Sequence, residues 1–112
     1  MKVVYVEAGV VPQVREIGSD LSSMQEAVGG MIEAVYPFRD PVALICNDEG
    51  KLLQMEPNRA LRHPETGKIY DIVFGPFFIC GLGEEDFTSL SEDLIAKYQR
   101  EFRYPELFIR SR

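Results

Sequence analysis

The architecture of this chain is set by three consecutive segments: Val42-Ala43-Leu44-Ile45-Cys46, Asn47-Asp48-Glu49-Gly50 and Lys51-Leu52-Leu53-Gln54-Met55. The first is a continuous apolar run, which predicts a central strand covered on both faces of a sheet. The second is polar and ends in a glycine that can adopt a positive φ, which predicts a hairpin turn. The third is therefore expected to return antiparallel to the first.

Upstream of this hairpin, the sequence predicts a strand over residues 2–7, which are rich in valine and tyrosine. After a Gly- and Pro-containing break, residues 13–17 are predicted to form a second strand that pairs with the first. Asp20 is a candidate N-cap for a helix over residues 21–28, whose apolar residues recur at helical spacing before Gly29-Gly30 ends it. Residues 31–36 are expected to form another strand.

Downstream, residues 69–74 and 77–80 are predicted to form a second hairpin around Gly75-Pro76. Ser89-Leu90-Ser91-Glu92 fits a capping box for a last helix. That helix has one apolar face, made by Leu90, Leu94, Ile95, Tyr98 and Phe102.

The order of these elements predicts an α+β fold in one domain over residues 1–112. We expect a mixed or mostly antiparallel sheet of five to seven strands with two helices packed on it. A doubly wound parallel sheet would need a helix between successive strands, and the sequence lacks them. A chain of 112 residues with 46% apolar side chains has room for one real core and not for two domains.

The formal net charge is −6, which argues against phosphate-backbone binding, so no direct nucleic-acid binding is expected. The charge is uneven, because residues 1–96 carry seven basic and sixteen acidic side chains while residues 97–112 carry five and two. Two interpretations stay open: the basic end folds back onto the acidic body, or it recruits a partner.

No apolar run approaches the roughly 18 residues that cross a bilayer, and the N-terminus does not resemble a signal peptide. A cytoplasmic protein without membrane contact is expected. Cys46 and Cys80 lie in apolar stretches and are predicted to be buried, reduced thiols, rather than a disulfide or a nucleophile. With two cysteines, one histidine and no metal-ligand spacing, neither a metal nor a cofactor is expected.

Hydrogen-bonding side chains that could converge on a ligand are concentrated in one segment of the sequence, which contains Asn58, Arg59, Arg62 and His63. Arginine recognises carboxylate or phosphate bidentately. These residues are therefore candidates for binding a nucleotide or another anion, and we expect them to lie in a loop. The alternative is a solvated connection whose arginines pair with nearby acids.

Two further segments are candidates for contact with a partner protein. Phe38 and Arg39 lie in Tyr36-Pro37-Phe38-Arg39-Asp40-Pro41, where stiff prolines flank residue types that dominate binding energies. If this segment is instead a buried corner, Arg39 pairs with Asp40 and Tyr36 is buried. Glu84, Glu85 and Asp86 could steer a basic partner. The alternative is that the acids near the last helix, Glu92 and Asp93 among them, complement its dipole.

No catalytic constellation is identifiable from spacing, so an enzyme is not expected. Six stretches of the chain match a known family: residues 29–38, 40–51, 58–61, 69–72, 77–79 and 81–87. On these stretches the chain resembles a family of small proteins carried by phages and conjugative elements of Gram-positive bacteria, described as a domain of unknown function. Two segments depart from the family pattern, Met55-Glu56-Pro57 and the end after Tyr104.

The resemblance implies a non-enzymatic accessory protein of a mobile element. Such a protein is expected to bind and inhibit a host defence effector, for example a CRISPR nuclease, through an acidic and aromatic surface. The alternative function is capture of a small anion by Asn58, Arg59 and Arg62. A homodimer formed through an exposed strand edge is a third hypothesis.

Overall fold

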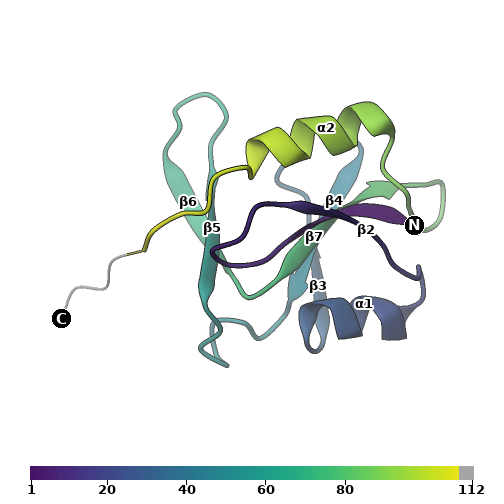
Figure 1. The fold of residues 1–112 in the computed structure, drawn as a ribbon, viewed down its shortest axis with the longest axis horizontal. Helices are drawn as coiled ribbons and strands as arrows, with labels where there is room; N and C mark the ends of the chain where they lie inside the picture. Colours follow the sequence, from purple (N-terminus) through teal and green to yellow (C-terminus); the bar gives the residue numbers. More distant parts are fainter. Residues whose placement is uncertain (109–112) are drawn as a thin grey trace.

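The computed structural model describes residues 1–108 and has two helices and two β-sheets in that part of the chain (Figure 1). In chain order, the elements are β1 (Lys2–Val6), β2 (Gln13–Glu16), α1 (Leu21–Val28), β3 (Ile32–Val35), β4 (Val42–Asn47), β5 (Pro57–Arg62), β6 (Ile69–Phe74), β7 (Phe77–Leu82), β8 (Phe87–Thr88) and α2 (Glu92–Glu101).

The main sheet has the order β2-β1-β7-β4-β3, with β8 paired to β7, and every pair in it is antiparallel. β5 and β6 form a separate antiparallel pair. This arrangement confirms the predicted α+β fold with a mostly antiparallel sheet and two helices. The predicted pairing of the first two strands is also confirmed.

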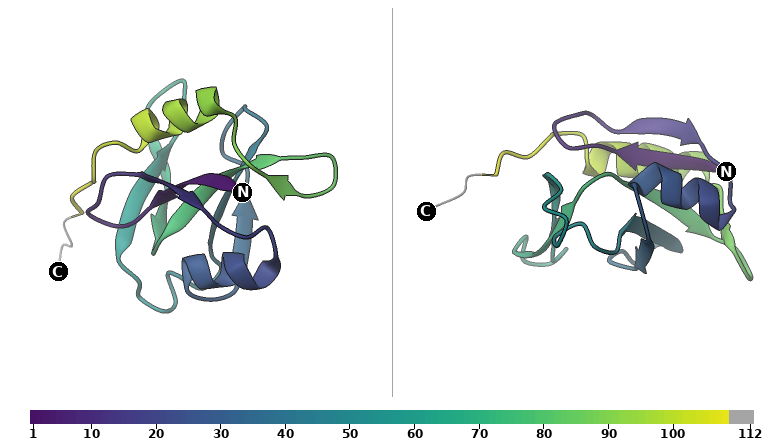
Figure 2. Two further views of the ribbon diagram at one scale, coloured as in Figure 1. Left: turned by 45° about the vertical axis from the view of Figure 1, so that its right-hand side comes forward. Right: turned by 90° about the horizontal axis from the view of Figure 1, so that it is seen from below.

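Because side chains alternate along a strand, each face of the main sheet has its own core. α1 covers one face, where Met24 and Val28 pack on Phe78 and its neighbours. α2 covers the other face together with the β5–β6 pair, as Figures 1 and 2 show. β4 is buried along its whole length, as its apolar run predicted.

The predicted hairpin after β4 is wrong. β4 pairs with β3 and β7, residues 48–54 form turns, and Leu52 is 82% exposed. Gly50 does not have a positive φ. A Cβ atom at position 50 would lie 2.5 Å from the carbonyl oxygen of Phe74. Because glycine has no Cβ, the turn can dock against the end of β6.

The predicted second hairpin is also wrong, because β6 and β7 follow one another in sequence but belong to different sheets. Gly75 between them has φ +84°, which favours glycine, and its carbonyl accepts a hydrogen bond from the Asn58 side chain. The chain therefore changes sheets at Gly75 instead of turning back on β6.

Both helices begin at capping side chains. Asp20 accepts from the Ser23 backbone N–H as predicted, and Gly29 ends α1 in the left-handed conformation. α2 is capped by Ser91 and not by Ser89, whose hydroxyl accepts the backbone N–H of Lys2 instead. Neither helix in residues 1–108 has the length and apolar character needed to cross a membrane.

Cys46 and Cys80 are both free and buried, as predicted. Burial raises the pKa of the Cys80 thiol to about 12 and that of Cys46 to about 11. The neighbouring Glu33 carboxylate adds to the effect on the pKa of Cys46.

Candidate functional site

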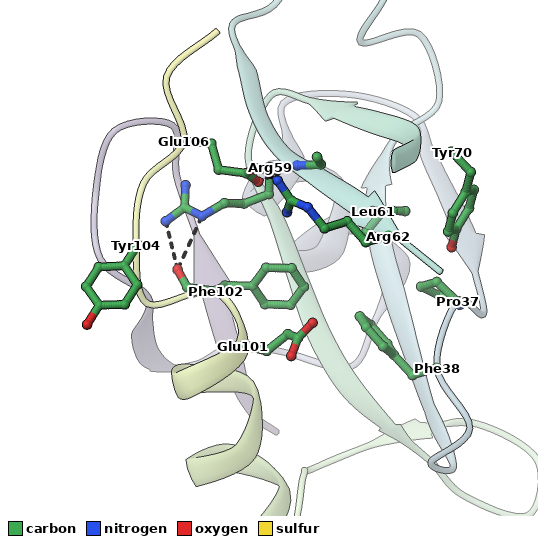
Figure 3. A pocket seen from close by; sticks show the side chains of 11 residues that line it. Pro37, Phe38, Arg59, Leu61, Arg62, Tyr70, Glu101, Phe102, Tyr104 and Glu106 are labelled. Atoms are coloured by element: carbon green, nitrogen blue, oxygen red, sulfur yellow. Dashed lines mark hydrogen bonds and ion pairs between the residues drawn. The ribbon is translucent and has the colours of Figure 1, made fainter. Parts of the chain in front are cut away.

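A groove runs between β5, the C-terminal end of α2 and the segment that contains Pro37 and Phe38 (Figure 3). It consists of two adjoining hollows of about 280 and 570 Å³, which share four lining residues. We call the two together the α2–β5 groove. The shared residues are Pro37, Phe38, Arg62 and Glu101.

Aromatic side chains and one carboxylate hold the α2 side of the groove in place. The Phe38 ring lies 4.8 Å from Tyr98 and 6.0 Å from Phe102, measured between ring centroids. The Tyr98 hydroxyl donates to Asp40 at 2.6 Å, and Lys97 Nζ lies 2.5 Å from the same carboxylate oxygen. The hydrogen bond from Lys97 is the main cause that lowers the pKa of Asp40.

Asn58 and Arg59 lie in β5 and not in the predicted loop, and both are almost fully buried. Asn58 Nδ2 donates to the carbonyls of Val6 and Gly75. Its Oδ1 accepts from Arg59 Nη1 at 2.9 Å. The polar character of this segment predicted a loop because polar residues are mostly exposed, but here they connect β5 to β1 and to the end of β6.

The Arg59 guanidinium binds backbone carbonyls from two distant segments, the end of α2 and the β1–β2 connection. Nε and Nη2 donate to Phe102 at 3.2 and 3.0 Å, as Figure 3 shows. Nη2 also donates to Val10 at 2.7 Å, and Nη1 to Glu7 at 3.4 Å. Burial lowers the pKa of Arg59 from its ordinary value. The donors of Arg59 are thus used within the fold.

Arg62, at the end of β5, is half exposed and points toward the groove (Figure 3). Its Nη2 lies 2.5 Å from Oε1 of Glu106, in the segment that follows α2. The other carboxylate oxygen of Glu106 accepts the backbone N–H of Ala60 at 2.6 Å. Sequence reasoning missed Glu106 and the Ala60 amide, because residues more than forty positions apart give no local signal.

Phe38 and Arg39 both line the groove. Arg39 is highly exposed and pairs with Glu65 at 3.3 Å, not with Asp40. The interpretation in which Tyr36 is buried is wrong, since that residue is 60% exposed. His63, near the same rim, lies against the ring of Tyr70 with centroids 4.7 Å apart.

Glu84, Glu85 and Asp86 do not line the groove. They form the exposed turn between β7 and β8, which Figure 1 shows at the opposite end of the molecule from β5. Glu92 and Asp93 occupy the first turn of α2, where carboxylates complement the helix dipole. Among the side chains of residues 1–108, no three His, Cys, Asp or Glu gather in a way that could hold a metal ion.

The basic end of the chain is described only in part. Residues 103–108 run past β5 and make contact through an acid, Glu106, rather than through an arginine. Arg110 and Arg112, which contribute to the predicted basic end, lie outside the described residues.

Comparison with protein families matches residues 1–103 to a domain of unknown function, DUF3846. The chain belongs to this family. Comparisons with curated proteins and with solved structures found no match. The family match covers both sheets, both helices and all residues of the groove except Tyr104 and Glu106.

Proposed function

We propose that the protein acts by binding another protein through the α2–β5 groove and does not catalyse a reaction. The observation that carries this proposal is the composition of the groove rim. Tyr70, Tyr104 and Arg39 are all exposed there, and Tyr104 is 74% exposed. Tyrosine and arginine are enriched among the few residues that supply most of the binding energy at protein interfaces.

The rim also has a framework that limits the cost of ordering on binding. Phe38 is held by Tyr98 and Phe102 beneath the rim. Side chains that are already fixed lose little conformational freedom when a partner docks. A groove with a fixed framework and large exposed side chains at its rim supports a binding surface better than a site for chemistry.

The resemblance to proteins of mobile elements supports a more specific form of the proposal. In this form the protein is an accessory of a phage or conjugative element, and its partner is a host defence effector such as a CRISPR nuclease. The net charge of −6 supports a basic protein as the partner, since complementary charge accelerates encounter. The acidic turn at Glu84, Glu85 and Asp86 then steers the partner from a distance, while the groove makes the contact.

The alternative function, capture of a small anion by Asn58, Arg59 and Arg62, has less support. An anion at Asn58 and Arg59 would have to replace internal hydrogen bonds of two buried side chains. Breaking these bonds would leave buried carbonyls unpaired, at about 1–3 kcal/mol each. Arg62 alone of the three is accessible to a ligand.

Affinity purification from bacteria with intact defence systems, followed by mass spectrometry, tests the proposal with two matched variants. The groove variant combines Arg39→Glu, Tyr70→Ser and Tyr104→Ser, all at exposed positions. The acidic-turn variant combines Glu84→Lys, Glu85→Lys and Asp86→Lys. We expect a stoichiometric protein partner with the wild-type chain, its loss with the groove variant and its retention, more weakly, with the acidic-turn variant.

Retention of the partner by the groove variant would contradict the proposal, as would recovery of no protein partner with the wild-type chain. Recovery of a bound nucleotide or other small anion in place of a protein would favour the alternative. Thermal unfolding of both variants serves as the control, since neither set of substitutions changes a buried side chain.

A further inference from the structure

Glu106 is held as a bound carboxylate ligand would be. Its two oxygens have separate donors, the Ala60 backbone N–H at 2.6 Å and Arg62 Nη2 at 2.5 Å. The Glu106 side chain is only 20% exposed. Hydrogen bonds with ionised partners of this kind are shorter and stronger than neutral ones.

Both donors belong to β5, inside the part of the chain that matches the family, whereas Glu106 follows the end of that match by three residues. The Ala60 backbone N–H donates a hydrogen bond to the Glu106 side chain. The edge of β5 that faces residues 103–108 is therefore covered by a carboxylate and not by a strand. The donors come from the domain, and the acid comes from the segment that follows it.

We propose that the Ala60 amide and the Arg62 guanidinium form a carboxylate-recognition site for an acidic side chain in an extended segment of a partner protein. In this chain the segment over residues 103–108 occupies the site, and a partner segment binds by displacing Glu106. The inference rests on the proposed function in taking the α2–β5 groove as the contact surface, and it specifies the chemistry that the partner brings there.

The surroundings of the site favour a protein segment over a free anion. Tyr70, which is 47% exposed, lines the same hollow as Arg62 and offers aromatic surface to a residue beside the acid (Figure 3). An unpaired strand edge can also hydrogen-bond to an extended backbone. A free small carboxylate would use the two donors and leave this surface empty.

Peptide binding to the full-length protein tests the site without a cellular partner. The probe is a fluorescent peptide with the sequence of residues 103–108, and its control has Gln at the position of Glu106. The proteins are the wild type, Glu106→Ala, which empties the site, and Glu106→Ala combined with Arg62→Ala, which also removes a donor. Fluorescence anisotropy measures the affinity.

We expect the Glu106→Ala protein to bind the Glu peptide roughly tenfold to a hundredfold more tightly than the Gln peptide. A difference of this size is expected because the Gln peptide cannot make a hydrogen bond with a charged carboxylate. The added Arg62→Ala substitution is expected to abolish this preference. The wild type is expected to bind the peptide at least about tenfold more weakly than Glu106→Ala, because its own Glu106 competes at a high effective concentration. In NMR spectra, the Ala60 amide proton is expected to shift upfield on Glu106→Ala and to return downfield with saturating Glu peptide.

Equal affinity of the Glu106→Ala protein for the two peptides, or binding of neither, would overturn the inference. Displacement of the peptide by an equal concentration of sodium glutamate would also overturn it, by assigning the site to free anions. The groove variant described above keeps Arg62 and Glu106. Failure of the peptide experiment therefore leaves the proposed function standing, and failure of the purification leaves this site standing.

Discussion

Arg59 brings a positive charge into the interior, and in residues 1–108 no carboxylate lies within ion-pair distance of it. Its donors are instead used by backbone carbonyls of the β1–β2 connection, β5 and the end of α2. Removing the guanidinium would take a donor away from the buried carbonyls of Asn58 and Phe102. The residue is therefore expected to stabilise the fold that positions the groove, rather than to bind a ligand directly.

Arg59→Leu is expected to lower the free energy of unfolding by about 3 kcal/mol, because buried oxygens of Asn58 and Phe102 lose their donor. Arg62→Leu, on the same strand but half exposed, is the matched control and is expected to cost about 1 kcal/mol or less. Urea unfolding of both variants provides the comparison. Similar losses in the two variants would show that Arg59 does not have this structural role.

Asp40 is expected to make the stability of the groove depend on pH. Its pKa is lowered from 3.8, mainly by the hydrogen bond from Lys97 and then by that from Tyr98. A carboxyl group whose pKa is lower in the folded state stabilises the protein above the ordinary pKa, and this stabilisation is lost as the pH falls through the lowered value. The wild type should therefore be more stable than Asp40→Asn at neutral pH, and the difference should shrink as the pH falls below 3.8. A difference in urea midpoints that stays constant with pH would contradict this assignment.

At the scale of the elements, most strands and both helices could be predicted from local sequence, but the pairing after β4 could not. The continuous apolar run of β4 and the helical spacing of α1 depend on neighbouring residues, which a single sequence shows. The turn at residues 48–54 depends instead on contact between Gly50 and Phe74, which are far apart in the chain. A polar turn ending in glycine resembles a hairpin turn whether or not the chain returns, so the pattern alone could not distinguish the two.

Gly50→Ala tests this explanation of the turn. The added methyl group would lie 2.5 Å from the Phe74 carbonyl oxygen, a backbone atom that cannot rotate away. We expect a loss of about 1–3 kcal/mol in the free energy of unfolding, typical of overpacking in a buried position. If the variant has the stability of the wild type, the close approach of the turn to β6 is wrong.

The candidate site was predicted in part, for reasons that differ from residue to residue. Phe38 and Arg39 were proposed as contact residues from their types alone, and both line the groove. Asn58 and Arg59 were recognised as unusual, but their polarity indicated a loop because nothing local reveals the carbonyls they bind. Glu106 was missed, since its partners depend on how the segment after α2 returns to β5.

For the molecule as a whole, charged edge strands bear on the oligomeric state. β2, one edge of the main sheet, carries Arg15 and Glu16, and β3, the other edge, carries Glu33. Charged side chains on edge strands disfavour pairing with a second copy. Light scattering is therefore expected to give the monomer mass of 12.7 kDa. Twice that mass at micromolar concentration would instead favour the homodimer hypothesis.

The central claim is that the α2–β5 groove, and not the acidic turn, is the surface that contacts a partner. A photo-crosslinking amino acid placed at Tyr70 in one chain and at Glu85 in another, each expressed in bacteria with an active CRISPR defence, measures this contact most directly. We predict one dominant crosslinked protein from position 70, lost when Arg39→Glu and Tyr104→Ser are added, and none from position 85. Crosslinking from position 85 alone, or from neither position, would contradict the account.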